Sequence, residues 1–141
     1  MAKDVYHELV KRALIKEGWL ITHDPYILEN KSDIESIKYQ IDLGAEKLIS
    51  AERDNEKIAV EIKSFLQPSF ANEFHSVLGK YLIYNQGLSE LDMTRILYLA
   101  IPDYAETKIE NYPFLQRVIE SYKIKIFVYN IENETITTWI K

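Results

Sequence analysis

Two acidic residues and a lysine are the groups in this sequence that could hydrolyse a phosphodiester bond. Glu61 and Lys63 stand two residues apart near the end of an apolar segment, and Asp42 precedes them in another apolar segment. Carboxylate oxygens are the ligands that Mg²⁺ and Mn²⁺ prefer in proteins. A metal ion held by Asp42 and Glu61 would polarise a phosphodiester and lower the pKa of a bound water molecule. Lys63 would position that water or stabilise the developing negative charge.

The segment that carries Glu61 and Lys63 has the clearest strand pattern in the chain. Because side chains alternate between the two faces of a strand, Glu61 and Lys63 share one face, and Ile58, Val60 and Ile62 share the other. Charged groups are costly to bury unless they are paired or bound to a metal ion. A half-exposed strand with a solvated glutamate and lysine would give the same pattern. An acid on the preceding strand, where it can face Glu61, favours a metal site.

The register of the hairpin formed by these two strands decides which acid stands near Glu61. A turn at Asp54-Asn55 would place Lys63 opposite Glu46. Asp42 would then lie on the same face as Glu61 but on the order of 20 Å away, at about 3.3 Å per residue. A bulge or sharp bend at Gly44 would have to bring Asp42 back. Otherwise Glu46 is the second acid, or a cross-strand partner of Lys63.

Hydrophobic periodicity and turn residues predict the elements that position these groups. Helices are expected at residues 4–17, 69–86 and 113–122, and strands at 19–22, 39–52, 57–63, 95–101, 125–129 and 135–140. The second strand is interrupted at Gly44, Gly87 ends the second helix, and residues 29–36 are expected to form a loop. A helix between the third and fourth strands permits parallel pairing of these strands. We therefore expect an α/β (α+β) fold with a mixed central sheet of four to five strands flanked by helices.

Length and composition fit one domain over residues 1–141, with 47% hydrophobic residues to form a core. The absence of cysteine excludes disulfide bonds, Cys-based zinc sites and thiol nucleophiles. No apolar signal segment follows Met1, and no stretch approaches the roughly 18 apolar residues that cross a membrane. A cytoplasmic protein without a membrane partner is therefore expected.

The net charge of −5, from 17 basic and 22 acidic residues, counts against a nonspecific nucleic-acid binder. Such binders usually carry an excess of basic residues. Carboxylates that await a metal ion contribute part of this charge, and a basic partner protein could supply the missing phosphate contacts. The acidity therefore disfavours a nuclease without excluding one.

The sequence resembles the PD-(D/E)xK nuclease superfamily through Asp42 and the Glu61-Ile62-Lys63 motif. It resembles the XisH family more closely, and this resemblance covers nearly the whole chain. The residues that carry it are 4–13, 41–49, 58–65 and 72–84. The stretch Ala-Val-Glu-Ile-Lys-Ser-Phe at residues 59–65 is the most specific of them.

The resemblance implies a restriction-endonuclease-like fold and metal-dependent DNA cleavage, with Mg²⁺ or Mn²⁺ as cofactor. It also implies an accessory role in the excision of a DNA element in cyanobacteria, beside a site-specific recombinase and a companion factor resembling XisI. In many superfamily members the first helix adds an acid near the metal. Glu8 fits that position, although a solvated helix face would equally explain it. Some members carry Gln-x-x-x-Tyr on the helix after the Glu-x-Lys strand; here Lys80 and Tyr84 have that spacing, and Lys80 could contact a DNA phosphate.

Two function classes follow from the sequence. The first is a metal-dependent DNA endonuclease with Asp42, Glu61 and Lys63 as catalytic residues, a metal held by Asp42 and Glu61 with Glu8, and Lys80 on the DNA. The second is a noncatalytic module with a nuclease fold that binds DNA or a partner protein and controls a recombinase. A homodimer is compatible with both classes.

Overall fold

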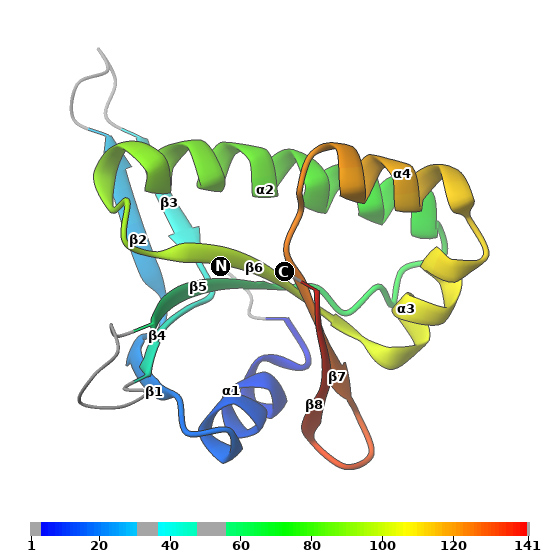
Figure 1. The fold of residues 1–141 in the computed structure, drawn as a ribbon, viewed down its shortest axis with the longest axis horizontal. Coiled ribbons are helices and arrows are strands. Elements are labelled where there is room, and N and C mark those ends of the chain that lie inside the picture. The colour runs from blue at the N-terminus through cyan, green and yellow to red at the C-terminus, as the bar shows by residue number, and fades with distance from the viewer. Residues whose placement is uncertain (1–3, 31–36, 48–55, 141) are drawn as a thin grey trace.

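The computed structural model describes residues 4–30, 37–47 and 56–140, and Figure 1 shows how they are arranged. The elements are α1 (His7–Lys16), β1 (Leu20–His23), β2 (Tyr26–Asn30), β3 (Ile37–Ile41), β4 (Leu43–Lys47), β5 (Glu56–Ile62), α2 (Phe70–Leu91), β6 (Ile96–Pro102), α3 (Asp103–Glu110), α4 (Pro113–Ser121), β7 (Ile126–Asn130) and β8 (Thr135–Ile140). None of the described helices has the length and apolar content that a membrane crossing requires.

The strands form a mixed sheet, as the sequence predicts. Its strand order is β1-β4-β5-β6-β7-β8, and β2 and β3 pair with each other as a separate antiparallel ribbon. The pairs β5–β6 and β6–β7 are parallel, and the outer pairs of the sheet are antiparallel. The parallel pairing of β5 with β6 across α2 confirms the expectation from the intervening helix. With six strands, the sheet is one strand larger than the upper end of the expected range.

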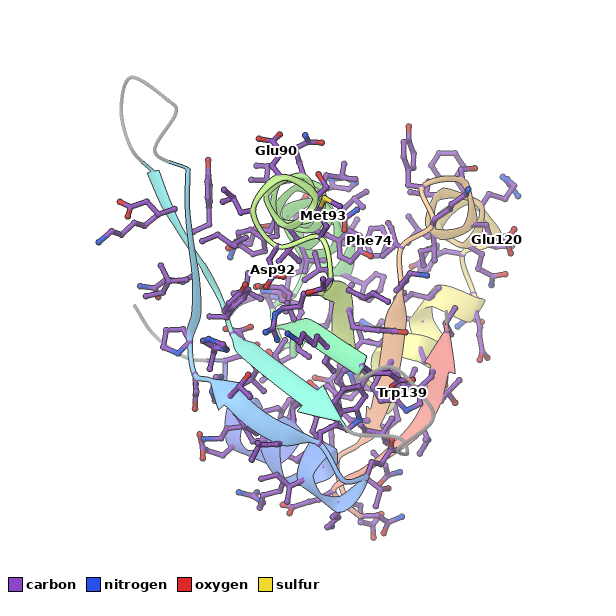
Figure 2. The ribbon with its side chains drawn as sticks, turned by 60° about the vertical axis from the view of Figure 1, so that its left-hand side comes forward. Phe74, Glu90, Asp92, Met93, Glu120 and Trp139 are labelled. Atoms are coloured by element: carbon purple, nitrogen blue, oxygen red, sulfur yellow. The ribbon has the colours of Figure 1, made fainter. Side chains whose placement is uncertain are left out.

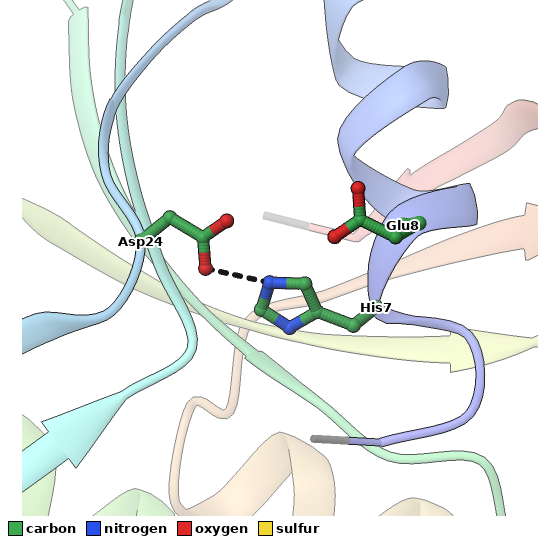
Figure 3. Close-up of side chains that lie close together, drawn as sticks. All are labelled: His7, Glu8 and Asp24. Carbon is green, nitrogen blue, oxygen red and sulfur yellow. Dashed lines mark hydrogen bonds and ion pairs between the residues drawn. The ribbon is translucent and has the colours of Figure 1, made fainter.

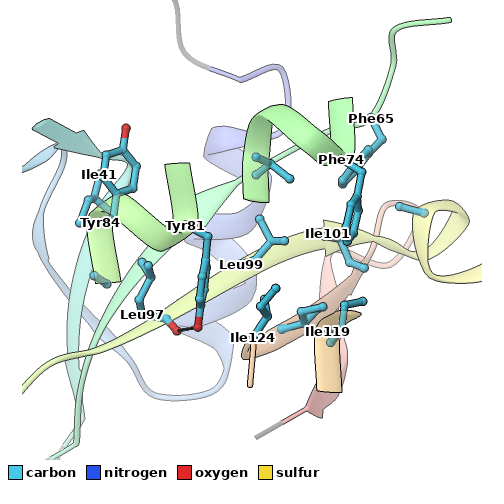
Figure 4. Close-up of a cluster of buried hydrophobic side chains, with 14 of the residues drawn as sticks. Ile41, Phe65, Phe74, Tyr81, Tyr84, Leu97, Leu99, Ile101, Ile119 and Ile124 are labelled. Carbon is cyan, nitrogen blue, oxygen red and sulfur yellow. Dashed lines mark hydrogen bonds between the residues drawn. The ribbon is translucent and has the colours of Figure 1, made fainter. Parts of the chain in front are cut away.

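The two faces of the sheet support two separate apolar layers. The first layer lies between the sheet and α2, and its side chains include Ala59, Phe74, Tyr81, Leu99 and Val128 (Figure 4). Figure 2 shows Phe74 on the sheet side of α2 and Glu90 on the opposite side of that helix. The second layer lies beneath α1, and its side chains include Leu14, Ile58, Val60, Tyr98 and Phe127. Successive residues of β5 alternate between the layers, as expected for a strand covered on both faces.

The register of β4 against β5 differs from the expected one. Leu43 pairs with Val60, and Glu46 pairs with Lys57 rather than with Lys63. The same register, continued by one residue, sets Asp42 beside Glu61. The expectation assumed a tight turn near residues 54–55, whereas β4 ends at residue 47 and β5 begins at residue 56. The intervening residues 48–55, which include most of the predicted turn, lie outside the described part of the chain.

Several element boundaries also differ from the expected ones. Residues 29 and 30 belong to β2 instead of a loop. The predicted strand at 39–52 is divided at Asp42 into β3, which belongs to the ribbon, and β4, which belongs to the sheet. Helix α2 continues through Gly87 to Leu91. A Cβ atom at Gly87 would lie 3.2 Å from Leu28 Cδ1, so glycine at this position allows β2 to approach the helix closely.

Candidate functional site

A recess of about 470 Å³ opens between β5, the segment that follows β5, and the first half of α2. Its lining combines carboxylate and ammonium groups with uncharged and apolar side chains. The charged residues that line it are Asp4, Asp42, Glu61, Lys63, Glu73 and Lys80. The fold therefore brings four of the five predicted site residues, Asp42, Glu61, Lys63 and Lys80, to one place.

The buried carboxylate of Glu61 and the half-buried carboxylate of Asp42 both line the recess. Asp42 lies at the bend between β3 and β4, where its Oδ2 atom accepts a hydrogen bond of 2.7 Å from the backbone N–H of Ile62. Glu61 projects from β5 towards α2 and is 7% exposed. Its Oε2 atom is buried and has no hydrogen-bond partner among the described residues. A buried carboxylate oxygen in this state is poorly satisfied by protein groups.

Burial and neighbouring charges raise the pKa values of both carboxyl groups. Burial, followed by the charge of Asp42, raises the pKa of Glu61 to about 8. Burial also raises the pKa of Asp42, although the hydrogen bond from Ile62 acts in the opposite direction. The two carboxylates thus cannot both ionise easily at neutral pH without a neighbouring cation.

Lys63 and Glu73 form an ion pair at the edge of the recess. Lys63 Nζ lies 2.8 Å from Glu73 Oε2, in an ionic contact whose angles are not those of a hydrogen bond. Glu73 Oε1 accepts a hydrogen bond of 2.5 Å from the backbone N–H of Gln67. Glu73 belongs to the first turn of α2. The sequence pattern gave no reason to single out Glu73, because only the fold brings that turn against the end of β5.

Asp4, and not Glu8, is the acid that the N-terminal segment contributes to the recess. Asp4 accepts hydrogen bonds from the backbone N–H groups of Tyr6, at 3.0 Å, and Ser64, at 2.9 Å. Its charge raises the pKa of both Asp42 and Glu61. Asp4 precedes α1 and lies at the start of the helix that the sequence predicts over residues 4–17.

Glu8 is exposed and lies outside the described lining of the recess, in a cluster with the buried His7 and with Asp24 (Figure 3). His7 Nε2 is 2.7 Å from Asp24 Oδ1, and Lys11 Nζ is 2.8 Å from Asp24 Oδ2 and 3.8 Å from Glu8 Oε1. The ammonium group of Lys11 therefore already supplies a positive charge between these acids. We interpret this cluster as an ion-pair network that joins α1 to the segment after β1.

Lys80 and Tyr84 complete the helix side of the recess, one turn apart on α2. The charge of Lys80 lowers the pKa of both Asp42 and Glu61. Burial, followed by the neighbouring carboxylates, raises the pKa of Tyr84 to about 12. Tyr84 is therefore a neutral phenol at physiological pH, able to donate a hydrogen bond.

Fold and recess together define an α/β protein with a carboxylate-rich site between a mixed sheet and one long helix. A family model described as XisH protein matches residues 1–137. A crystal structure of an XisH family protein from Nostoc punctiforme is 35% identical, with a TM-score of 0.84 over 98% of this chain and 100% of that chain. The crystal structure of an FdxN element excision controlling factor protein from Anabaena variabilis is 36% identical, with a TM-score of 0.83 over 99% of this chain and 100% of that chain. No curated protein matches.

The chain belongs to the XisH family. The resemblance found in the sequence is thus confirmed for that family over nearly the whole chain.

Proposed function

We propose that this protein is a factor in the programmed excision of a DNA element, and that its recess hydrolyses phosphodiester bonds with Mg²⁺ or Mn²⁺. The first part is supported by the name of the Anabaena variabilis relative, an element excision controlling factor. The second part depends on one observation. Glu61 is buried beside the half-buried Asp42, whose charge raises the pKa of Glu61, and Glu61 presents a buried oxygen without a protein partner among the described residues.

The donor set fits a divalent cation of the Mg²⁺ type. Asp42 and Glu61 are the residues that would hold it, because hard cations select carboxylate oxygens and offset the repulsion between paired acids. The bound ion would supply Lewis-acid chemistry to the phosphodiester and to a water molecule. Asp4 lies close enough to influence the charge of both carboxylates and replaces Glu8 as the N-terminal acid of our proposal.

The lysines of the chain have separate roles in this proposal. Lys63 places a positive charge beside the two acids, where it would stabilise negative charge that develops on the phosphate. Its ion pair with Glu73 fixes the direction of the side chain. Lys80, exposed on α2, would contact a DNA phosphate at the opening of the recess. The PD-(D/E)xK pattern of Asp42 and Glu61-Ile62-Lys63 supports placing the protein among nucleases of that superfamily.

A noncatalytic role is the second candidate, and the charge of the chain favours it. A net charge of −5 repels DNA, and Glu73 neutralises the lysine nearest to the acids. In this case the fold would bind DNA or a companion protein resembling XisI and control a site-specific recombinase without cleaving DNA itself.

A cleavage assay on supercoiled, branched and single-stranded DNA separates the two candidates. The protein would be tested with Mg²⁺ and Mn²⁺, alone and with its companion factor. We expect Glu61→Ala and Lys63→Ala each to reduce cleavage by orders of magnitude, since each removes charge stabilisation from the transition state. Glu90→Gln, on the outer side of α2, is the matched control. Cleavage that survives both substitutions at full strength indicates a contaminant, and an inert wild type under all conditions supports the noncatalytic role.

A further inference from the structure

Two aliphatic side chains border the recess and face solvent. Val5 is 66% exposed and Leu66 is 56% exposed, and both line the recess together with the carboxylates. Val5 comes from the segment before α1, and Leu66 comes from the segment between β5 and α2. Two parts of the chain that are far apart in sequence thus place apolar groups beside the same acids.

Hydrogen bonds of the residues on both sides of Leu66 fix the backbone so that the Leu66 side chain faces solvent. Before it, the Ser64 N–H donates to Asp4 Oδ2 at 2.9 Å, and the Ser64 carbonyl oxygen accepts a hydrogen bond from the Tyr104 hydroxyl. After it, the Gln67 N–H donates to Glu73 Oε1 at 2.5 Å. The segment is therefore anchored on either side of Leu66.

Phe65 completes this arrangement by turning inward. Its backbone has φ 55, a left-handed conformation that is unfavourable for a residue with a side chain. Its ring is buried 4.9 Å from the ring of Phe70. This turn sends Phe65 into the core and Leu66 to the surface, so the protein holds an apolar side chain in water at a fixed place beside the acids. A fixed apolar side chain beside a charged recess suits contact with the apolar part of a ligand.

We propose that Leu66 and Val5 contact unpaired bases, and that the substrate is DNA with unpaired nucleotides at the scissile phosphate. This proposal rests on the nucleic-acid role proposed above. A continuous duplex conceals the faces of its bases and offers mainly phosphates, but the recess has four carboxylates against two lysines and is poorly suited to phosphates alone. Unstacked bases offer apolar faces to aliphatic and aromatic side chains.

The depth of the acids points to the same substrate class. Glu61 is almost completely buried, so a phosphodiester must enter the recess to reach it. A duplex carries its phosphates on a stiff convex surface, whereas an unpaired strand bends sharply enough to insert a single phosphate. Enzymes that do chemistry on a base take that nucleotide out of the stack to bring it into a pocket, and a phosphate that must enter a recess imposes a similar demand.

Fluorescence anisotropy with three oligonucleotides of one sequence tests the proposal. The probes are a duplex, a single strand and a fork with an unpaired junction, each bound in Ca²⁺ and then cleaved in Mn²⁺. We expect the fork and single strand to bind about tenfold more tightly than the duplex, and Leu66→Ser to remove most of that difference. Leu20→Ser changes a leucine on β1 that lies outside the recess and is 67% exposed, against 56% for Leu66, and it should have no effect.

The outcomes separate this proposal from the nuclease proposal. Equal binding and cleavage of duplex and fork would overturn the substrate class and leave the nuclease intact. Preference for unpaired DNA that depends on Leu66, without cleavage, would support the substrate class and overturn catalysis. Failure to bind any of the probes, or a Leu66→Ser defect confined to binding of the companion protein, would overturn the proposal.

Discussion

Glu61 is part of the proposed site, but burial of its ionised carboxylate lowers the stability of the folded protein. Its carboxyl is buried beside that of Asp42, and its pKa rises from 4.5 to about 8. A folded-state pKa above the unfolded value means that the folded protein binds the proton more tightly. The resulting stability is fully present below about pH 4.5 and is lost as the pH rises towards 8.

We therefore expect Glu61→Gln to raise the melting temperature of the metal-free protein. The gain should be a few degrees at pH 8 and small at pH 4.5, because glutamine does not titrate. Thermal unfolding in EDTA at both pH values measures it. Added Mn²⁺ should stabilise only the wild type. A variant that is less stable than the wild type at pH 8 would contradict this account.

Because Lys63 and Glu73 form an ion pair, we expect a second substitution to recover stability that the first one removes. Lys63→Met leaves the buried carboxylate of Glu73 without its cation, at a cost of roughly 1–3 kcal/mol because Lys63 is partly exposed. Glu73→Gln added to this variant should recover more than half of the loss, since it removes the uncompensated charge. Urea unfolding of the double-mutant cycle measures the coupling. Additive effects would show that the pair is not energetically coupled.

At the scale of elements, the sequence predicted secondary structure well where apolar and polar residues alternate or recur with helical periodicity. It predicted β5, the parallel pairing of β5 with β6, and the face that carries Glu61. It missed the register of β4 because a hairpin register depends on the length of the connection, which polar residues alone do not define. It missed α3, which follows β6 directly after Pro102. Asp4 and Glu73 could not be found, because only tertiary packing brings them to the recess.

The two glycines of α2 give a matched test of helix packing. Gly79→Ala should stabilise the protein by about 0.5–1 kcal/mol, because a Cβ atom there meets nothing within 4 Å and alanine favours the helix. Gly87→Ala should gain less, or destabilise, because its Cβ must displace Leu28. Urea unfolding compares the two variants. Equal gains would mean that β2 adapts freely to the added methyl group.

At the scale of the whole molecule, the net charge of −5 limits how DNA can be held. If Lys63 and Lys80 are the phosphate contacts, the logarithm of the binding constant should fall with the logarithm of salt concentration with a slope of about −1.4 for a single strand. Lys80→Ala should reduce that slope by about 0.7 and weaken all sequences alike. Anisotropy titrations at several salt concentrations measure both values. A steep slope that Lys80→Ala leaves unchanged would place the DNA on another surface.

The apolar layer beneath α1 has a spectroscopic consequence, because the segment after α1 packs there against β8. The chain has 2 tryptophans, Trp19 and Trp139, and their ring centroids lie 5.9 Å apart, on the opposite side of the sheet from α2. Trp139, labelled in Figure 2, also lies 4.7 Å from Phe127. Tryptophan fluorescence therefore reports only on the apolar layer beneath α1. It should change on global unfolding and stay unchanged when a ligand binds in the acidic recess. A change in emission on binding such a ligand would show that binding changes the conformation of the apolar layer on the opposite face of the sheet.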